Sequence, residues 1–589
     1  YCELAQREVE VLTLSQDTTE SDLKQRKEII NGSSLLVDQA PVRAALKGRI
    51  LVVDGIEKAE RNVLPTLNNL LENREMSLSD GRFLVSPSRF DALLQSGHTA
   101  ESLHSRGLVR VSPEFRVIAL GLPVPEFPGF PIDPPLRSRF QGRYVSFTHS
   151  PLIQLHQKFS PTEAVDTFFR ALSALRGSTG GLLDSQRVLP APISATVEVA
   201  SLLQMFPAES TISLIQRIYP FHLFGLDAAQ QEALVSLMDN VSSSSGPVVE
   251  NGYRIQGTPY VEQTSSDQCQ NCLVEFLTHG NGNSDLVRVP VKTGSIGTDR
   301  LNTSYVPIGS HQKCLTQMMQ THALGYDICV VGSKGCGKSI LADHFSRSLG
   351  YLRPEIICCY KDMTSRDLLQ RRRTDHAGNT QWVFSPLVVA ALEGNIAVLD
   401  GVNRLTGDAL SVLAQLIRDR ELHLPDGRRL LRHDRYDSIV AKIQNGKLEN
   451  ALRIHPSFRL LALGTPPDRE NPWLSAEVLG MFPFIETLHS LSIEERMQVV
   501  SRRIPPETLA DRALLQSLRG LCGTMDIVQS DPSRDTKMSV AAASTSLSPS
   551  CRQLLRLWQG CREQINTVTD GSLLNDQCVE SVVDIKSRV

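Results

Sequence analysis

Residues 327–339 read Asp-Ile-Cys-Val-Val-Gly-Ser-Lys-Gly-Cys-Gly-Lys-Ser, and this stretch decides the fold. A short apolar strand is followed by the loop pattern Gly-x-x-x-x-Gly-Lys-Ser and then by an amphipathic helix. The helix is predicted to bury Ile340, Leu341, Phe345 and Leu349. A strand, a glycine-rich loop and a helix in this order predict an α/β domain built on a parallel sheet.

The loop is predicted to bind the phosphates of a nucleotide. Glycines allow successive backbone N–H groups to surround a phosphate, and the helix N-terminus adds a positive dipole end. Lys338 is expected to reach the β- and γ-phosphates, and the Ser339 hydroxyl to ligate Mg²⁺. ATP and Mg²⁺ are therefore the expected cofactors, and a glycine-rich turn that binds nothing is the alternative. The predicted binding residues are Gly332, Ser333, Lys334, Gly335, Cys336, Gly337, Lys338 and Ser339.

An ATPase also needs a carboxylate at the end of a neighbouring apolar strand. Asp400 follows the apolar run 396–399, and we expect it to organise the Mg²⁺ ion and to serve catalysis. An aspartate that merely caps a turn is the alternative. The residue after this aspartate is usually a glutamate that polarises the attacking water, but here it is Gly401. The sequence therefore predicts slow hydrolysis.

The sequence repeats itself at an offset of 343 to 346 residues. Residues 18–26, 51–55, 73–82 and 115–121 match residues 363–371, 397–401, 419–428 and 458–464 in the same order. Asp54 and Gly55 thereby correspond to Asp400 and Gly401. Four matched blocks predict a tandem duplication of one α/β module. The offset places the phosphate loop of the first copy upstream of Tyr1, so we expect the chain to be part of a longer protein.

The predicted organisation is two tandem modules, each a parallel-sheet α/β core followed by a small helical lid. The expected segments are a first core at 1–150 without its phosphate loop, its lid at 151–240, a linker with a small β insertion at 241–304, a second core at 305–490 and its lid at 491–589. Within the second lid, residues 529–550 are rich in serine and are expected to form a disordered loop.

Composition excludes several classes of protein. The 589 residues carry 61 Lys and Arg against 64 Asp and Glu, so there is no strong nucleic-acid signal. No uncharged apolar run reaches the roughly 18 residues that a membrane-spanning helix needs. The 12 cysteines are scattered and are expected to be reduced thiols. Cys269 and Cys272 have zinc-like spacing, but no second pair accompanies them.

The phosphate loop, the strand that ends in Asp400 and the repeated blocks resemble those of the AAA+ ATPases. The resemblance is to the branch that has a hairpin inserted in helix 2 and includes MoxR-like, dynein and midasin modules. The pattern Glu-x-x-Leu-x-Asp-Gly-Arg, at 75–82 and 421–428, is taken as the distinguishing hairpin. The resemblance implies a ring-type mechanochemical ATPase. Its partners would be ATP, further AAA+ modules in cis or in neighbouring subunits, and a protein substrate that the sequence does not identify.

The resemblance also assigns catalytic arginines. Arg139, with Arg137 as the second choice, matches the arginine finger that a module donates to its neighbour, although both could be surface residues. Arg552 matches the second sensor in the lid, and a plain surface arginine explains it equally well. The second copy has no arginine between Arg469 and Arg496 and therefore no finger there.

Two further features depend on the resemblance. Leu122 and Thr465 stand where the family has a polar sensor, usually asparagine, and Thr465 could replace it only in part. Residues 61–76 and 122–140 most resemble a mitochondrial member of the family, associated with the matrix side of the inner membrane. This implies a mitochondrial location, with no transit peptide visible in the chain.

Three other functions stay open. The strongest is a non-hydrolysing scaffold in which bound ATP sets the geometry of a ring. A metabolic kinase or GTPase would share the phosphate loop, but the duplication and the finger-like arginines disfavour it. A nucleic-acid motor has no basic stripe to support it.

Overall fold

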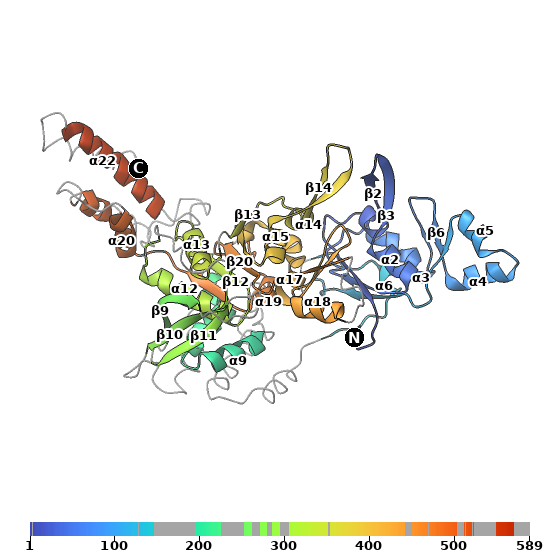
Figure 1. Ribbon diagram of the computed structural model, residues 1–589, viewed down its shortest axis with the longest axis horizontal. Coiled ribbons are helices and arrows are strands. Elements are labelled where there is room, and N and C mark those ends of the chain that lie inside the picture. Colours follow the sequence, from blue (N-terminus) through green and yellow to red (C-terminus); the bar gives the residue numbers. More distant parts are fainter. Residues whose placement is uncertain are drawn as a thin grey trace. The chain divides into compact units, whose positions relative to one another are not determined.

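A computed structural model describes residues 1–2, 4–125, 127, 129–145, 195–224, 252–261, 271–279, 285–294, 305–351, 354–441, 450–468, 471–503, 512, 514–520, 522 and 549–569. The chain divides into two compact units. Unit 1 comprises Tyr1–Pro161, Glu355–Leu460 and Trp473–Phe482, and unit 2 comprises Thr162–Pro354, Leu461–Pro472 and Pro483–Val589. Figure 1 labels the elements of both units.

Unit 1 begins with a parallel sheet of three strands in the order β1-β4-β8. These strands are β1 (Val9–Thr13), β4 (Ile50–Asp54) and β8 (Arg116–Leu120). Leu51 and Val53 of β4 are buried in the hydrophobic core. Helix α2 (Ala40–Lys47) packs against the sheet and ends at Gly48, whose φ of +72° is the left-handed conformation that favours glycine.

The remaining elements of this part follow the order expected for an α/β core with a hairpin between its first two strands. They are α1 (Glu20–Leu23), β2 (Gln25–Ile30), β3 (Ser33–Asp38), η1 (Leu64–Leu67), α3 (Asn68–Glu72), β5 (Met76–Ser77), β6 (Phe83–Val85), α4 (Pro87–Gln95), α5 (Ala100–Ser105), β7 (Leu108–Arg110) and α6 (Pro134–Arg137). The apolar face of η1 and α3 is buried through Leu64, Leu67 and Leu70.

A second set of elements in unit 1 has the same order. It consists of β13 (Glu355–Cys358), α14 (Ser365–Leu369), β14 (Gln370–Thr374), β15 (Thr380–Phe384), α15 (Pro386–Glu393), β16 (Ile396–Asp400), η4 (Val402–Arg404), α16 (Gly407–Ser411), α17 (Ala414–Arg418), β17 (Leu422–His423), β18 (Arg429–Leu431), α18 (His433–Val440), β19 (Ala451–Arg453) and α19 (Ala476–Met481). The pairing also recurs, because β17-β18-β19 repeats β5-β6-β7 and β14-β15 repeats β2-β3.

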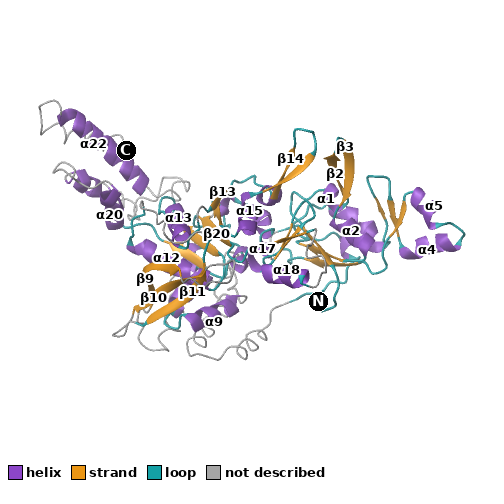
Figure 2. Cartoon of the chain, viewed as in Figure 1, coloured by secondary structure: helices purple, strands orange, loops and turns teal. Residues whose placement is uncertain are grey.

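The hairpin that interrupts a helix is not the one named from the sequence. The hairpin β14–β15 lies between α14 and α15, whereas the Asp-Gly turns join β5 to β6 and β17 to β18. Both Asp-Gly turns do form, with φ of +87° at Gly81 and +91° at Gly427. The hairpins β2–β3 and β14–β15 lie side by side (Figure 2), joined by the bond from Ile29 N–H to Thr380 Oγ1 at 2.9 Å.

Unit 2 contains the strand and helix on either side of the phosphate loop, β12 (Ile328–Gly332) and α13 (Lys338–Ser348). All five residues of β12 are buried, as expected for a strand inside a parallel sheet. It pairs in parallel with β20 (Arg459–Gly464) and β21 (Ile485–Leu488). In unit 1, β13 pairs in parallel with β16.

The other elements of unit 2 are helical except for one small sheet. The helices are α9 (Thr196–Met205), α10 (Thr211–Ile218), η3 (Phe221–Leu223), α12 (Gly309–Ala323), α20 (Ile493–Arg503) and α22 (Cys551–Thr569). The strands β9 (Gly252–Val261), β10 (Asn271–His279) and β11 (Leu286–Lys292) form an antiparallel sheet, within the segment expected to hold a β insertion. The described residues include no helix that is long and apolar enough to cross a bilayer. Most of the serine-rich segment 529–550 lies outside the described residues.

Candidate phosphate-binding site

The loop between β12 and α13 needs its glycines for two different reasons. Gly335 and Gly337 have φ of +84° and +97°, a conformation that residues with a side chain rarely adopt. Gly332 is instead closely packed, because a Cβ there would lie 2.6 Å from the carbonyl oxygen of Leu488. The backbone can therefore follow a tight curve beside the end of the sheet, as phosphate binding by N–H groups requires.

Lys338 lies folded over the loop. Its Nζ donates to the carbonyl oxygens of Gly332 at 2.6 Å and Ser333 at 2.9 Å. A lysine ammonium that donates to backbone carbonyls can exchange these bonds for the stronger, charge-assisted bonds to a phosphate. Ser339 is exposed in the first turn of α13.

The predicted inward face of α13 is mostly confirmed. Leu341, Phe345 and Leu349 are buried. The prediction for Ile340 is wrong, since this side chain is 42% exposed. Ile340 lies in the first turn of α13 next to Ser339, which is also exposed.

Neighbouring segments of unit 2 enclose the loop on several sides. Val331 pairs with Gly464, so that Thr465 follows the end of β20 next to the start of the loop. On the other side of β12, Ser490 Oγ lies 3.3 Å from Ser333 Oγ.

The start of α22 also lies against the loop. A Cβ on Gly335 would be 2.7 Å from the Cβ of Ser550. Arg552 is two residues further along and is exposed. The structure thus brings the segment that carries the predicted second sensor next to the phosphate loop.

Asp400 lies in unit 1, where it ends β16. Its carbonyl accepts the Cys359 N–H at 2.9 Å, and Arg404 Nη1 donates to the Cys359 carbonyl at 3.2 Å. Gly401 has a φ of +86° and immediately precedes the short helix η4. A side chain at position 401 would therefore be strained, and its Cβ would lie 3.4 Å from Arg404 Nε.

In the first set of elements, β1 to α6, the segment after Asp54 corresponds to the segment after Asp400. It contains a buried carboxylate, Glu57, that the sequence did not indicate. Glu57 is only 2% exposed, and its Oε2 accepts the Leu122 N–H at 3.2 Å. Burial raises the pKa of Glu57 and also that of Asp54. Leu122 stands where the family has a polar sensor side chain, but here it is the backbone N–H of Leu122 that makes the hydrogen bond. The residue at the equivalent position in the second set is Asn403, so the pattern gave no signal for Glu57.

The candidate finger arginine packs onto its own part of the chain. Arg139 Nη2 forms an ion pair with Glu72, and Arg139 Nε donates to the Asn68 carbonyl at 3.2 Å. Arg137, at the end of α6, is exposed. In the second set, Arg418 stands at the position equivalent to Glu72, and its Nε donates to the Gly480 carbonyl at 3.0 Å.

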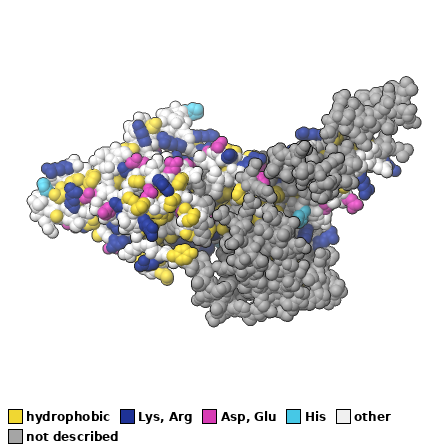
Figure 3. Space-filling model, turned by 180° about the vertical axis from the view of Figure 1, so that it is seen from behind, with side chains coloured by type: hydrophobic (Ala, Val, Ile, Leu, Met, Phe, Trp, Pro, Cys, Tyr) yellow, Lys and Arg dark blue, Asp and Glu magenta, His cyan; other side chains and the backbone are white. Residues whose placement is uncertain are grey.

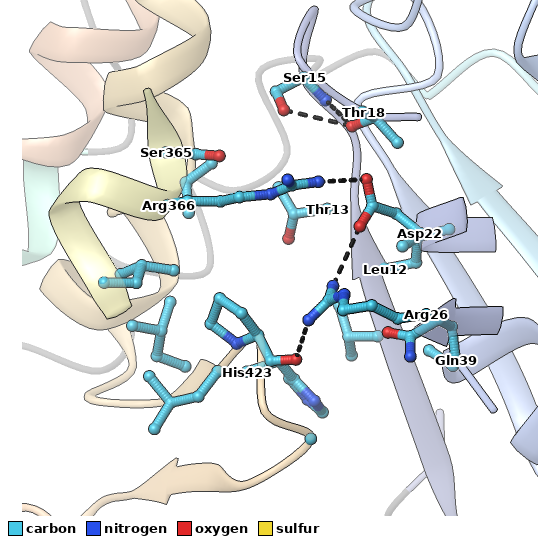
Figure 4. A pocket seen from close by; sticks show the side chains of 18 of the residues that line it. Leu12, Thr13, Ser15, Thr18, Asp22, Arg26, Gln39, Ser365, Arg366 and His423 are labelled. Atoms are coloured by element: carbon cyan, nitrogen blue, oxygen red, sulfur yellow. Dashed lines mark hydrogen bonds and ion pairs between the residues drawn. The ribbon is translucent and has the colours of Figure 1, made fainter. Parts of the chain in front are cut away.

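The two sets of elements in unit 1 contact each other through a charged pocket (Figure 4). Asp22 lies between Arg26, at 3.0 Å, and Arg366, and Arg26 Nη1 also donates to the Pro425 carbonyl at 2.7 Å. Burial opposes ionisation of Asp22, but hydrogen bonds from Thr19 and the two arginines outweigh it and lower its pKa. The two sets are therefore joined by the ion pair between Asp22 and Arg366, whose side chains are 13% and 47% exposed, and by the hydrogen bond from Arg26 to the Pro425 carbonyl.

The cysteines give no indication of a metal centre. Cys272 is buried in β10, and burial raises the pKa of its thiol to about 12. Cys269 lies outside the described residues. Among the residues that the structure describes, there is no group of three or more His, Cys, Asp or Glu side chains that could hold a metal ion. On the face shown in Figure 3, the visible basic and acidic side chains are interspersed.

Comparison with known proteins identifies the family. The profile of the AAA domain (dynein-related subfamily) matches residues 1–140 and 327–482, which together make up half of the chain. The chain belongs to this AAA family. Both matches contain the elements described above, from β1 to α6 and from β12 to α19.

Parts of the chain are similar to several known proteins. The chain is 41% identical over 573 residues to von Willebrand factor A domain-containing protein 8 of Mus musculus, covering 95% of this chain but only 28% of that protein. It is 28% identical over 197 residues to Protein NorQ of Paracoccus denitrificans (strain Pd 1222), covering 33% of this chain and 66% of NorQ. A solved structure of a mutant of Thermotoga maritima RuvB covers 47% of this chain and 71% of RuvB, with 16% identity and a TM-score of 0.26.

Proposed function

We propose that the chain contains two AAA+ modules in tandem and that the second module binds Mg-ATP. The observation that carries this proposal is the loop 332–339, in which left-handed glycines curve the backbone and Lys338 covers the hollow side. The repeated order of elements and the two separate family matches support the tandem arrangement.

Asp400 is proposed to belong to the same site as the loop. The family match runs without a break from 327 to 482 and therefore includes both the loop and Asp400. In the first set, the equivalent strands β4 and β8 are parallel, with Asp54 opposite Leu120. Because ligands bind at the carboxyl ends of parallel strands, an aspartate that ends such a strand is suited to a nucleotide site.

The residues of the site have distinct proposed roles. Backbone N–H groups of the loop and Lys338 would bind the phosphates. The Ser339 hydroxyl and the Asp400 carboxylate would hold Mg²⁺, and both are the oxygen donors that this ion prefers. When bound, Mg²⁺ would neutralise phosphate charge.

Turnover in this module is proposed to be slow. Gly401 has no side chain to orient or deprotonate a water molecule, and Thr465 is a weak substitute for the family's asparagine. A base residue typically contributes about 10²–10⁴ to the rate, so its loss leaves little hydrolysis. The same observations favour a second candidate, a scaffold in which bound ATP sets ring geometry without being hydrolysed.

The test combines binding with phosphate release. ATP binding should require Mg²⁺ in the unmodified chain, and Asp400→Asn should remove most of that requirement without abolishing binding. Phosphate release near the background rate would favour the scaffold, and release above background that Asp400→Asn abolishes would favour slow turnover. ATP binding that is equally tight with and without Mg²⁺ would contradict the assignment of Asp400 and Ser339.

Assembly and location are also proposals. We propose that the modules associate with further AAA+ modules into a ring that acts on a protein substrate. Arg139 would contribute to the nucleotide site of a neighbouring module, and Arg552 to the site of its own module. A mitochondrial location is proposed from the resemblance of residues 61–76 and 122–140. Light scattering with and without ATP tests the first proposal, and cell fractionation tests the second.

A further inference from the structure

Helix α12 carries two buried histidines that make the same kind of bond to different carbonyls. His311 is 5% exposed, and its Nε2 lies 2.8 Å from the carbonyl oxygen of Cys336. His322 is 1% exposed, and its Nε2 lies 2.9 Å from the carbonyl oxygen of Lys292. Cys336 belongs to the phosphate loop, whereas Lys292 ends β11 in the small antiparallel sheet. Only the first bond can therefore act directly on the loop.

The bond fixes the protonation of the His311 ring. A carbonyl oxygen can only accept, so Nε2 must carry the hydrogen and donate it. Nδ1 of His311 is buried and has no hydrogen-bond partner among the described residues. Burial lowers the pKa of His311, which keeps the ring neutral. His311 is thus a neutral donor directed at the loop.

The ring also packs against the next residue of the loop. A Cβ on Gly337 would lie 2.7 Å from His311 Cε1. The ring also belongs to an aromatic stack in which Tyr305 is 6.0 Å from His311 and 3.8 Å from His344, measured between ring centroids. His344 is part of α13, the helix that begins at the loop. The imidazole therefore contacts the loop backbone and, through Tyr305, is connected to the helix that follows the loop.

The start of α12 is itself anchored. Ser310 donates from its N–H at 2.9 Å and from its Oγ at 2.6 Å to Glu495 Oε1. Glu495 lies in the first turn of α20. These bonds anchor the backbone next to His311 to a helix outside the phosphate loop.

We propose that His311 is a positioning residue of the phosphate loop, an inference that rests on the proposed nucleotide site. In a trans peptide, the carbonyl and the following N–H point in opposite directions. By holding the Cys336 carbonyl outside the loop, His311 directs the Gly337 N–H towards the hollow side of the loop. That N–H then meets a phosphate without a prior rotation of the peptide, so the loop is preorganised for an anion.

The experiment compares Mg-ATP affinity in four variants by calorimetry. His311→Phe keeps an aromatic ring but cannot donate, and it should weaken binding roughly tenfold, the effect of one lost hydrogen bond. His311→Gln carries its amide nitrogen close to the position of Nε2 and should restore affinity to within about threefold of the unmodified chain. His322→Phe and His322→Gln are matched controls on the same helix and should leave affinity unchanged.

Each outcome bears on the inference separately from the function. If the unmodified chain does not bind Mg-ATP, the proposed function fails and the inference fails with it. If the unmodified chain binds and His311→Phe binds equally well, only the inference is overturned. Equal losses in His311→Phe and His322→Phe would also overturn it, because they would indicate a general packing defect. Should His311→Phe fail to fold, His311→Asn replaces it. Its shorter amide cannot reach the Cys336 carbonyl, so it should bind more weakly than His311→Gln.

Discussion

At the scale of single residues, the phosphate loop imposes two kinds of constraint that glycine meets and residues with a side chain do not. Gly335 and Gly337 need a left-handed backbone, and Gly332 needs space beside the Leu488 carbonyl. Gly401 is also left-handed, so a catalytic glutamate at this position would conflict with the local backbone. The left-handed backbone after Asp400 therefore disfavours a glutamate at the position where the family usually has its catalytic base.

The conflict at Gly401 leads to a prediction with two readouts. Gly401→Glu should lower the melting temperature, because a side chain in the left-handed region costs roughly 1–2 kcal/mol. It should raise phosphate release if the missing base limits turnover. Gly401→Asn is the control, since asparagine tolerates this conformation better and cannot act as a base. Calorimetric melting and a phosphate-release assay measure both effects. Unchanged release in a folded Gly401→Glu protein would contradict the attribution of slow turnover to the base.

At the scale of elements, the helical segment expected to be the first module's lid packs onto strands of the second core within unit 2. Arg217 of α10 forms an ion pair with Glu486 of β21 at 2.8 Å, and their side chains are 3% and 0% exposed. Arg217 also donates to Gln320 and Thr321 of α12. A single buried pair therefore joins α10, α12 and β21.

Removing one member of this pair should destabilise unit 2 strongly. Arg217→Met would leave the Glu486 carboxylate buried without its partner charge, which typically costs about 3–5 kcal/mol. The double variant Arg217→Met with Glu486→Gln should recover a large part of that loss, because the unpaired charge is gone. Urea unfolding of the three proteins gives the comparison. Equal stability of the single and double variants would show that charge burial is not the dominant effect.

At the scale of the whole molecule, both units contain histidines whose burial lowers the pKa. In unit 2, burial and the neighbouring His489 lower the pKa of His222 from the ordinary 6.5 to about 4. In unit 1, burial and the charges of Arg429 and Arg43 lower the pKa of His423 to about 3, against the opposing charge of Glu10. The fold therefore favours the neutral form of each ring over the protonated form.

This linkage predicts that stability falls when the pH is lowered from about 6.5 towards 4. The unfolded chain takes up a proton near pH 6.5, whereas the folded histidines do not until the pH is much lower. Stability should be constant with respect to these groups above pH 7. His222→Gln should flatten the pH dependence of unit 2, as followed by thermal melting between pH 7.5 and 4.5. An unaltered slope in this variant would mean that other groups control the acid response.

The sequence predicted those parts of the site that lie close together in the chain. The strand, loop and helix at 327–349 form one contiguous pattern, and Asp400 ends a recognisable apolar strand. His311, Glu495 and Ser550 gave no signal, because each reaches the loop region from a distant segment and through a contact that depends on packing. The hairpin β14–β15 was missed for a different reason: Arg371, Arg372 and Arg373 in succession do not show the apolar alternation by which strands are recognised.

The recurring order of elements in unit 1 was predictable because the sequence repeats. The matched blocks coincide with corresponding elements, from β4 and β16 to the hairpins β5–β6 and β17–β18. The repeat could not show which elements of the first set contact which elements of the second set. The contacts of Asp22 with Arg366 and of Lys58 with Glu477, the latter at 2.9 Å, join residues that are more than 340 positions apart.

The central claim is that residues 332–339 bind Mg-ATP, and calorimetric titration of the unmodified chain and two lysine variants tests it most directly. Lys338→Ala should lose most of the affinity, because its ammonium lies over the loop where the β- and γ-phosphates would bind. Lys313→Ala removes an exposed lysine from α12 and should bind as the unmodified chain does. Saturable binding that Lys338→Ala abolishes and Lys313→Ala preserves is the predicted result. Binding of equal strength in all three proteins would contradict the claim, as would no binding to the unmodified chain.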